Sequence, residues 1–557
     1  MSVLQIDKPK PHLMIKPIRL LALHLCFFPL CFIACKNSAN QQVSKLSDSA
    51  AALQTWNKSV QGGFSDQQTL LFDSIQLDSF LIQYIDFKSY KAELKHFYQK
   101  QDYTYVWFDE NGLIEQAGNL IDRVSNIQKD GIFTPLPYKN KLDSLISEYH
   151  QNKDTEPLLE LEFMLTSQYF SFAHKVWQGM DASVSEKESW FLPRKTLSYE
   201  VYLDSLLKAS KEQTPIADAP VYRQYHLLKA YLEKFTSLQN QPWTTLQLSG
   251  KSLKLGDSDP LIPELRKRLI LLEAFTKEGS TDSIFDSDLF EAVKDYQARM
   301  GLNADGVIGP GTIRALNITP KSRIRTILVN MERSRWLPLS LKEDYIAVNI
   351  PEFKLHVYHS DSLLWSSNVV VGKDVHKTVI FSGEIQYIVF SPYWNIPSSI
   401  VRNEIVPAMQ KDKDYLSKKR MEITGYSGGL PIVRQKPGPG NSLGQVKFLF
   451  PNSHNIYLHD TPAKPLFNEA SRAFSHGCVR VQDPEKLAAF LLKRDTTWNA
   501  GTIHDAMQKG EEKWVVLKHK TPVFLTYLTA FVDRDGKINF REDVYQRDER
   551  LAEMLIH

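Results

Sequence analysis

The chain has 557 residues, enough for two to four domains of ordinary size. Its 43% hydrophobic and 24% charged residues are typical of a folded globular protein rather than a disordered chain. The 67 lysines and arginines nearly balance the 64 aspartates and glutamates, so the formal net charge is only +3. A charge this small gives no support to nucleic-acid binding, which requires a strongly basic surface or domain.

The N-terminus is typical of an export signal. Basic residues precede an apolar run at 20–34, which is too short to cross a bilayer and matches the apolar region of a signal peptide. The run ends Phe-Ile-Ala-Cys at Cys35, which resembles a bacterial lipobox, so we expect residues 1–35 to be a lipoprotein signal with Cys35 lipidated. An ordinary cleaved signal peptide is the alternative, and Met14 is an alternative start. Residues 36–65, rich in Ser, Gln, Asn and Ala, are expected to be a linker.

Cysteine usage singles out one thiol. The four cysteines are Cys26, Cys31, Cys35 and Cys478. If Cys35 carries the lipid, Cys478 is the only free thiol of the mature protein. Exported proteins usually pair their cysteines in disulfides. A single unpaired cysteine is therefore a candidate nucleophile.

Residues 66–245 are expected to form a helical domain. Apolar side chains recur at helical spacing, for example at 158–165 and 222–232, and give stripes that can pack together. Segments 105–108 and 130–132 interrupt the pattern as loops. The aromatic residues of this region are interpreted as core.

Residues 246–318 form a distinct small unit with three expected helices. These span 262–269, 290–300 and 313–317. The Gly-rich run at 305–312 lacks the Lys-Ser/Thr of a phosphate loop, so its glycines are assigned to turns and helix starts. The unit resembles the small three-helix peptidoglycan-binding domain, with Val-Lys-Asp-Tyr-Gln at 293–297 as part of the signature. The resemblance implies a cell-wall glycopeptide as ligand or anchor.

From about 319 the pattern turns to short β-strands rich in β-branched and aromatic residues. The expected strands are 345–350, 354–358, 367–372, 385–390, 446–450, 455–458 and 514–517. They predict a domain at 319–522. A segment at 398–445 interrupts them, with a helical first part (398–420) and then a Gly/Pro-rich loop. Inserts of this length between strands often form lids.

Two further segments complete the C-terminal part. A helix is expected at 483–494. Residues 523–557 are expected to form a hairpin that turns at Asp535-Gly536, followed by a terminal helix.

The candidate chemistry lies between 457 and 480. Cys478 is flanked by Ser-His-Gly and Val-Arg, and His459 belongs to Tyr-Leu-His-Asp-Thr-Pro at 457–462. A thiol attacks a carbonyl as the thiolate, so it needs a base nearby. His459 and the closer His476 are both candidates.

Neighbouring groups can stabilise charge at such a site. The N–H groups of Gly477 and Cys478 and the hydroxyl of Tyr457 can form an oxyanion hole. Arg480 offers a fork-shaped cation for a substrate carboxylate.

Three other interpretations of these residues remain. The cysteine and histidines can be core residues. A zinc site built from His454, His459, His476 and Cys478 is conceivable. The single residue between His476 and Cys478 is an awkward spacing for tetrahedral chelation, and no Cys-x-x-Cys or His-Glu-x-x-His pattern accompanies it. The third interpretation is an inactive catalytic fold on a wall-binding protein.

The segment 457–481 resembles the signature of the L,D-transpeptidases of the bacterial cell wall. Val-Gly-Lys at 371–373 and Ser-Pro-Tyr-Trp-Asn-Ile-Pro at 391–397 resemble motifs of the long, multi-domain members. The resemblance implies a multi-domain α+β fold: a helical scaffold, a three-helix peptidoglycan-binding domain and a mostly β, sandwich-like catalytic domain with the capping insert 398–445.

The resemblance also implies residue roles. Cys478 would be the nucleophile and His459 its base, with His476 auxiliary. A backbone carbonyl orients the base in this family, so Asp460 receives no catalytic role. The remaining roles are oxyanion stabilisation for Gly477, Cys478 and Tyr457, and substrate binding for Arg480, Trp394 and Ser475. No metal or cofactor is expected.

The expected activity is formation of 3→3 peptidoglycan cross-links through a thioester, with release of terminal D-alanine. Alternatives are L,D-carboxypeptidase activity or protein attachment by the same site, a non-catalytic peptidoglycan-binding lipoprotein and, more remotely, a zinc peptidase. The expected partners are donor and acceptor tetrapeptide stems and, through the lipid, a membrane facing the periplasm, most simply the outer membrane. No nucleic acid is expected, the oligomeric state stays open, and the resemblance implies acylation of Cys478 by carbapenems.

Overall fold

The computed structural model describes residues 70–109, 112–152, 157–208, 220–277, 282–338 and 343–556. The predicted signal peptide, its Cys35 and the whole of the predicted linker therefore lie outside the described residues. Among the described helices, none combines the length and the apolar character that a membrane span requires.

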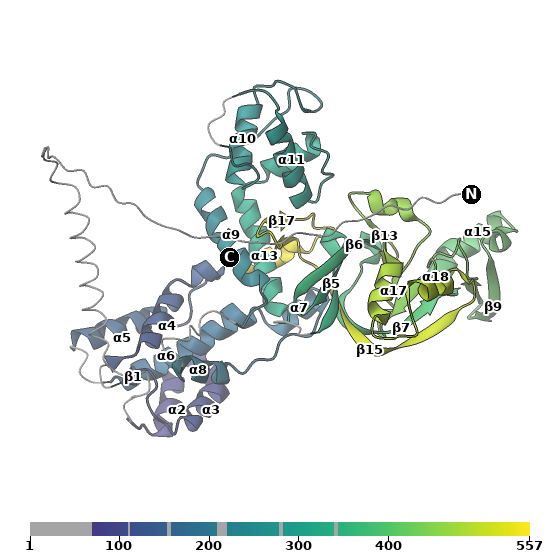
Figure 1. Cartoon of the computed structure of the whole chain (residues 1–557). Coiled ribbons are helices and arrows are strands. Elements are labelled where there is room, and N and C mark those ends of the chain that lie inside the picture. Colours follow the sequence, from purple (N-terminus) through teal and green to yellow (C-terminus); the bar gives the residue numbers. More distant parts are fainter. Residues whose placement is uncertain are drawn as a thin grey trace, which may run out of the picture. The chain divides into compact units, whose positions relative to one another are not determined.

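The N-terminal region is helical, as predicted (Figure 1). Its helices are α2 (Ser74–Gln83), α3 (Lys91–Lys100), α4 (Glu115–Ser125), α5 (Lys139–Gln151), α6 (Leu159–Phe172), α7 (Ala182–Lys187), α8 (Tyr199–Lys208) and α9 (Gln224–Leu238). Helix α6 is central, because 12 of its 14 residues are buried. A small hairpin, β1 (Phe108–Asp109) with β2 (Gly112–Leu113), begins at the end of the segment predicted as a loop.

The next unit has its own hydrophobic core, formed by residues such as Leu265, Leu289 and Val293. Its helices α10 (Ile262–Leu271), α11 (Ser287–Arg299) and α12 (Pro310–Asn317) confirm the three predicted ones. Gln297 organises the Gly-rich turn: its Nε2 donates to the Val307 carbonyl at 2.9 Å, and its Oε1 accepts from the Gly306 N–H at 2.8 Å.

The prediction that β structure begins at 319 is wrong for the first segment. Helix α13 (Pro320–Trp336) occupies it, and the Thr319 hydroxyl caps the helix by accepting from the Ser322 N–H at 3.2 Å. Thirteen of the 17 residues of this helix are buried, so it has no broad solvent-exposed face. The alternation of an apolar and a polar side that marks a surface helix is therefore absent from its sequence. Its apolar residues join the core of the N-terminal helices on one side and the core of the following β domain on the other.

A buried ion pair on α13 joins these two cores. The Glu332 carboxylate contacts Arg335 Nη1 at 2.7 Å and accepts from the Trp336 indole N–H at 2.8 Å and the Met180 N–H at 2.6 Å. Arg335 also donates to the carbonyls of Val176 and Asp130. Both charged side chains are 1% exposed.

We expect Glu332→Ala to lower the free energy of unfolding by about 3–5 kcal/mol, because it leaves the Arg335 charge buried and unpaired. The matched control is Glu549→Ala, which breaks the exposed pair between Arg325 of the same helix and Glu549 of the C-terminal helix and should cost at most about 1 kcal/mol. Urea unfolding followed by circular dichroism measures both. Equal losses in the two variants would contradict this role of Glu332.

The C-terminal domain is mostly β, and its sheet closes on itself. Its strands are β3 (Trp190–Phe191), β4 (Asp344–Asn349), β5 (Lys354–His359), β6 (Ser362–Gly372), β7 (Ile380–Phe390), β11 (Val446–Leu449), β12 (Leu458–His459), β13 (Ala473–Ser475), β14 (Val479–Val481) and β15 (Lys513–Thr526). The order is β11-β12-β14-β6-β5-β4-β15-β7-β3, and β7 also pairs with β11. Alternate residues such as Ile346, Val357 and Val369 fill the interior, so the other face of each strand points outward.

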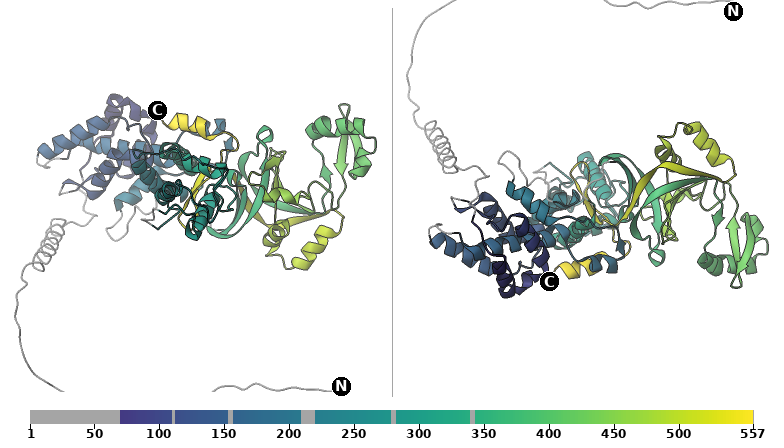
Figure 2. Two further views of the ribbon diagram at one scale, coloured as in Figure 1. Left: turned by 90° about the horizontal axis from the view of Figure 1, so that it is seen from above. Right: turned by 90° about the horizontal axis from the view of Figure 1, so that it is seen from below.

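The C-terminal elements differ from the prediction in two respects. Strand β15, the long curved strand of Figure 2, runs from Lys513 to Thr526, so the boundary predicted after 522 falls inside it. The hairpin is shorter than predicted: β16 (Ala530–Val532) pairs with β17 (Ile538–Phe540) across the predicted Asp535-Gly536 turn. Helices α17 (Pro484–Leu492), α18 (Ala500–Gln508) and α19 (Asp548–Leu555) complete the domain.

The insert forms a small lobe, here called the cap (Figures 1 and 2). It comprises β8 (Trp394–Asn395), α14 (Ser398–Ile400), η6 (Val401–Ile405), α15 (Val406–Lys411), α16 (Tyr415–Lys418), β9 (Met421–Ser427) and β10 (Leu430–Gln435). Ile396, Val401, Ile405 and Val433 form its own core. The helical first half was predicted. The second half is a hairpin, with the glycines at 428–429 as its turn, rather than the predicted loop.

Candidate active site

The candidate nucleophile lies where two short parallel strands begin side by side. β12 pairs with β14 so that Leu458 lies opposite Val479 and His459 opposite Arg480. The Val479 N–H donates to the Tyr457 carbonyl at 3.1 Å, which fixes Tyr457 beside Cys478. This pairing brings together two short segments of the chain that contain Tyr457, His459, Cys478 and Arg480. Their catalytic roles stay predictions.

The loop before Cys478 is held by its own hydrogen bonds. The Ser475 hydroxyl donates to the Cys478 carbonyl at 2.5 Å and accepts from the Gly477 N–H at 3.1 Å. Ser475 is buried, which favours a positioning role over the predicted contact with substrate. Because the Gly477 amide already has a partner, the amide of Cys478 is the better oxyanion donor of the two.

A second layer supports this loop, and sequence reasoning missed it. Thr378 donates to the Gly477 carbonyl at 2.8 Å and accepts from the Gly372 N–H at 2.9 Å. The Tyr545 hydroxyl donates to the Gly372 carbonyl at 2.6 Å. A side chain at Gly372 would lie 2.0 Å from the His376 carbonyl, so only glycine fits there. The Val-Gly-Lys motif at 371–373 was the one sequence signal for this layer.

The Cys478 thiol is partly buried and close to polar groups. Its Sγ lies 3.6 Å from the Asn455 carbonyl oxygen. Burial raises the pKa of this thiol, while the hydroxyl and amide of Tyr457 and the charge of Arg480 partly offset that increase. The resting thiol therefore keeps its proton at neutral pH.

His459 is a buried, neutral imidazole. Its Nδ1 lies 2.5 Å from the Asp460 carbonyl oxygen, and burial together with the charge of Arg480 lowers its pKa to about 3. Lys447 lies opposite His459 on β11, so cations flank the ring in two neighbouring strands. Among the described residues, Cys478 Sγ makes no hydrogen bond to the His459 ring. Such bonds are often long before substrate binds.

Trp394 connects the base of the cap with the nucleophile. Its side chain hydrogen-bonds to Tyr457, and the Tyr457 hydroxyl hydrogen-bonds to Cys478. The indole N–H can only donate, so the Tyr457 oxygen accepts from Trp394 and its own proton is the one available to donate, either to the sulfur or to a developing oxyanion. Burial and the neighbouring thiol raise the pKa of Tyr457, which keeps the hydroxyl protonated as a donor.

The second histidine faces the cap instead of the thiol. His476 Nε2 lies 2.8 Å from a carboxylate oxygen of Glu404, and its ring lies 5.2 Å from that of His376. His454, a member of the conceivable zinc set, packs against Phe381 with ring centroids 4.9 Å apart. The four candidate ligands therefore do not converge, and no metal-holding group of His, Cys, Asp or Glu occurs in the described part of the chain.

Family comparisons agree with this organisation. Residues 343–516 match the model of the L,D-transpeptidase catalytic domain. The chain contains an L,D-transpeptidase catalytic domain. Residues 92–232 match the scaffold domain, and residues 258–316 match the "Putative peptidoglycan binding domain". The three matches occur in the order that the sequence predicted.

One curated relative is a "Putative L,D-transpeptidase" of Haemophilus influenzae. It is 31% identical over 259 residues, which cover 43% of this chain and 50% of the relative. The chain thus spans half of the length of this relative.

Solved structures include L,D-transpeptidases of Stackebrandtia nassauensis and Xylanimonas cellulosilytica. Both are 14% identical, cover 50% of this chain and cover 97% and 100% of their own chains, respectively. Their TM-scores are 0.22 and 0.17, so they carry no argument about this protein.

The electrostatics of the L,D-transpeptidase site predict how its thiol reacts with pH. Both pKa shifts, upward for Cys478 and downward for His459, favour the neutral pair over a thiolate–imidazolium pair. Alkylation of Cys478 by iodoacetamide should therefore be slow at pH 6 and rise about tenfold per pH unit, with no plateau through pH 8, because the raised pKa of the thiol lies above this range. A fast rate that is already constant from about pH 5 would show a preformed ion pair and contradict this description.

Proposed function

We propose that the protein is a cysteine-dependent L,D-transpeptidase that forms 3→3 cross-links between peptidoglycan stems. The observation that carries the proposal is the free Cys478 thiol beside Tyr457 and Arg480, within a domain that matches the L,D-transpeptidase catalytic family. A peptidoglycan-binding domain in the same chain supports the choice of substrate.

The first half-reaction transfers an acyl group to the thiol. Cys478 Sγ attacks the carbonyl of the third, diamino-acid residue of a tetrapeptide stem. The new C–S bond forms as the C–N bond to the terminal D-alanine breaks. His459 takes the thiol proton and delivers it to the departing amine. The Asp460 carbonyl accepts from Nδ1–H and fixes the orientation of the ring, so Nε2 is the nitrogen proposed to take this proton.

The second half-reaction releases the enzyme. The side-chain amine of a neighbouring stem attacks the thioester, and the new C–N bond forms as the C–S bond breaks. His459 takes the proton that the attacking amine loses and passes it to the departing thiolate. Negative charge develops on the carbonyl oxygen in both halves. The Cys478 amide and the Tyr457 hydroxyl, aligned by Trp394, are the donors proposed to stabilise it.

Arg480 is proposed to bind a stem carboxylate. Its Nε is buried without a hydrogen-bond partner among the described residues, and burial lowers the pKa of its guanidinium. A carboxylate would supply the missing partner, and the planar guanidinium suits it. The cap above Trp394 is proposed to cover the donor stem, with His476 acting only through its bond to Glu404.

The cellular setting follows from the substrate. We propose a cell-envelope protein anchored by a lipid on Cys35, facing the periplasm, most simply from the outer membrane. Peptidoglycan-related domains support the envelope location. Carbapenems are expected to acylate Cys478, since they present a reactive carbonyl to the same nucleophile.

The test is incubation of the purified protein with a disaccharide-tetrapeptide, followed by mass spectrometry of the products. A cross-linked dimer, formed equally with and without a chelator, is the expected result. Tripeptide alone would replace the proposal by an L,D-carboxypeptidase. Loss of product on chelation would favour a zinc enzyme. Absence of any product, with binding to sacculi retained, would favour a structural wall-binding protein.

A further inference from the structure

A cavity of about 450 Å³ lies on the outer face of the catalytic barrel, away from Cys478. Its floor is formed by outward-pointing residues of three neighbouring strands, including Tyr345 of β4, Tyr358 of β5 and Phe524 of β15. Its walls come from the start of α9, from α11 of the peptidoglycan-binding domain and from the hairpin β16–β17. Ligand sites often lie between domains and have this size.

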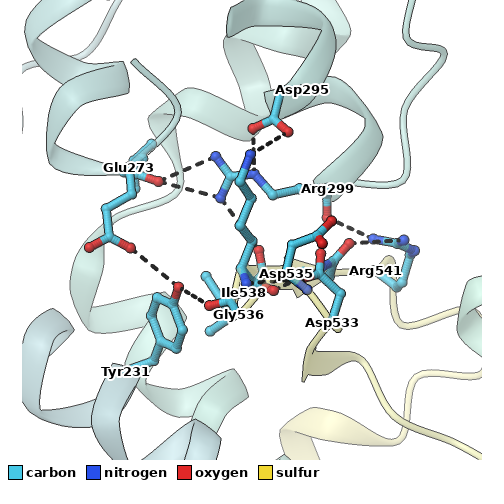
Figure 3. Close-up of polar contacts among 12 residues, drawn as sticks. Tyr231, Glu273, Asp295, Arg299, Asp533, Asp535, Gly536, Ile538 and Arg541 are labelled. Atoms are coloured by element: carbon cyan, nitrogen blue, oxygen red, sulfur yellow. Dashed lines mark hydrogen bonds and ion pairs between the residues drawn. The ribbon is translucent and has the colours of Figure 1, made fainter. Parts of the chain in front are cut away.

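The hairpin holds the walls in place (Figure 3). The Tyr231 hydroxyl of α9 donates to the Gly536 carbonyl at 2.8 Å. On the other side, Arg541 donates to the carbonyl of Arg299 in α11 at 2.6 Å, and Lys537 pairs with Asp295 at 2.9 Å. The cavity is therefore formed before a ligand arrives, which reduces the entropy lost on binding.

The lining combines aromatic faces with hydrogen-bonding groups. Tyr345 and Tyr358 stack with ring centroids 4.7 Å apart, and Phe524 meets Tyr345 edge-on at 6.1 Å. The guanidinium of Arg534 lies over the Tyr358 ring, 5.8 Å from its centroid. A sugar ring presents apolar C–H groups on its faces and hydroxyls at its edge, so it can contact both kinds of group.

The charges of the lining argue against an ionic ligand. Five basic and five acidic residues line the cavity, so they cancel. Several are already bonded within the wall: Glu352 pairs with His356 at 3.0 Å, and the Asp533 carboxylate accepts from the Lys537 N–H at 2.9 Å. A neutral, hydroxyl-rich ligand suits such a surface better than a phosphate or a charged peptide.

One end of the cavity lies within reach of the active site, although Cys478 is not part of its lining. The Phe353 carbonyl, next to cavity residue Glu352, accepts from Val369 of β6 at 2.9 Å and from Arg472 of the catalytic loop at 3.3 Å. On its other side, β6 pairs with β14 at Val370–Arg480. Two strand spacings, about 10 Å, therefore separate this end of the cavity from the Arg480 backbone. An extended tetrapeptide spans up to about 14 Å.

We propose that this cavity binds the disaccharide of the glycan strand whose stem peptide reaches Cys478. The inference rests on the proposed function, because it names the part of the same substrate that lies outside the catalytic centre. Tyr358, beside the Arg534 guanidinium, is the aromatic residue expected to contact the sugar.

The test uses the full chain with Cys478→Ala, which cannot turn over, and glycan oligomers from which an amidase has removed the stems. Calorimetry should show binding that Tyr358→Ala weakens at least tenfold and Arg534→Ala at least fivefold. Tyr358→Phe keeps the ring and should remain within threefold. Phe133→Ala, which removes an exposed aromatic side chain elsewhere, is the matched control and should change nothing.

The active enzyme gives a second readout. Tyr358→Ala should raise KM for the disaccharide-tetrapeptide about tenfold and leave kcat, and KM for the free tetrapeptide, unchanged. Unaltered glycan binding in Tyr358→Ala, or displacement of the glycan by free tetrapeptide, would overturn the inference. If glycan binding depends on Tyr358 but the protein shows no turnover, the cavity is a glycan site and the proposed function is wrong.

Discussion

Cys478→Ala is expected to abolish transpeptidation, with a loss on the order of 10⁶-fold that reaches the floor of the assay. Without the sulfur, no atom of the protein accepts the acyl group of the stem, so both half-reactions stop. The protein should still fold, because the polar contacts of the thiol among the described residues are only those to the hydroxyl and amide of Tyr457 and, at 3.6 Å, to the Asn455 carbonyl. The measurement is the rate of dimer formation from a disaccharide-tetrapeptide.

Two controls accompany this variant. The melting temperature and the binding to sacculi should match those of the unaltered protein. Retention of more than a few per cent of the activity in Cys478→Ala would mean that another group carries the reaction, and the description of the site would be wrong.

His459→Gln is expected to lower kcat by about 10²–10⁴-fold. The amide keeps a polar group in the buried position but cannot accept the thiol proton. The matched comparison is His476→Gln, for which we expect a loss of less than about tenfold, because this ring bonds to Glu404 of the cap. Steady-state kinetics of both variants measure the difference. A larger loss for His476→Gln would assign the base to His476, and equal losses would contradict His459 as the single base.

The fold was predictable where a pattern has a clear period. The strands β4 to β7 were predicted because apolar residues either alternate with polar ones along them or occupy consecutive positions. Helix α11 was predicted because its apolar residues recur at helical spacing and form a stripe along one side. Helix α13 was missed because burial on nearly all sides removes the stripe, although Thr319-Pro320 is an ordinary helix start. The cap hairpin was missed because the glycines at 428–429 were interpreted as a loop instead of a turn between two strands.

The site was predictable to the extent that it is local in sequence. Tyr457, His459, Cys478 and Arg480 come from two short segments, and the register of β12 with β14 places them together. The contributions of Thr378 and Tyr545 could not be predicted, because they depend on hydrogen bonds between segments up to 173 positions apart. The cavity over β4, β5 and β15 is likewise assembled from four regions of the chain.

The most direct measurement of the central claim is the intact mass of the protein after brief exposure to a tetrapeptide donor without an acceptor amine. The thioester mechanism predicts a mass increase equal to the donor minus one D-alanine, located on the peptide that contains Cys478 and absent from Cys478→Ala. A protein that releases D-alanine without ever carrying this mass, or carries it in Cys478→Ala, would contradict the assignment of Cys478 as the nucleophile.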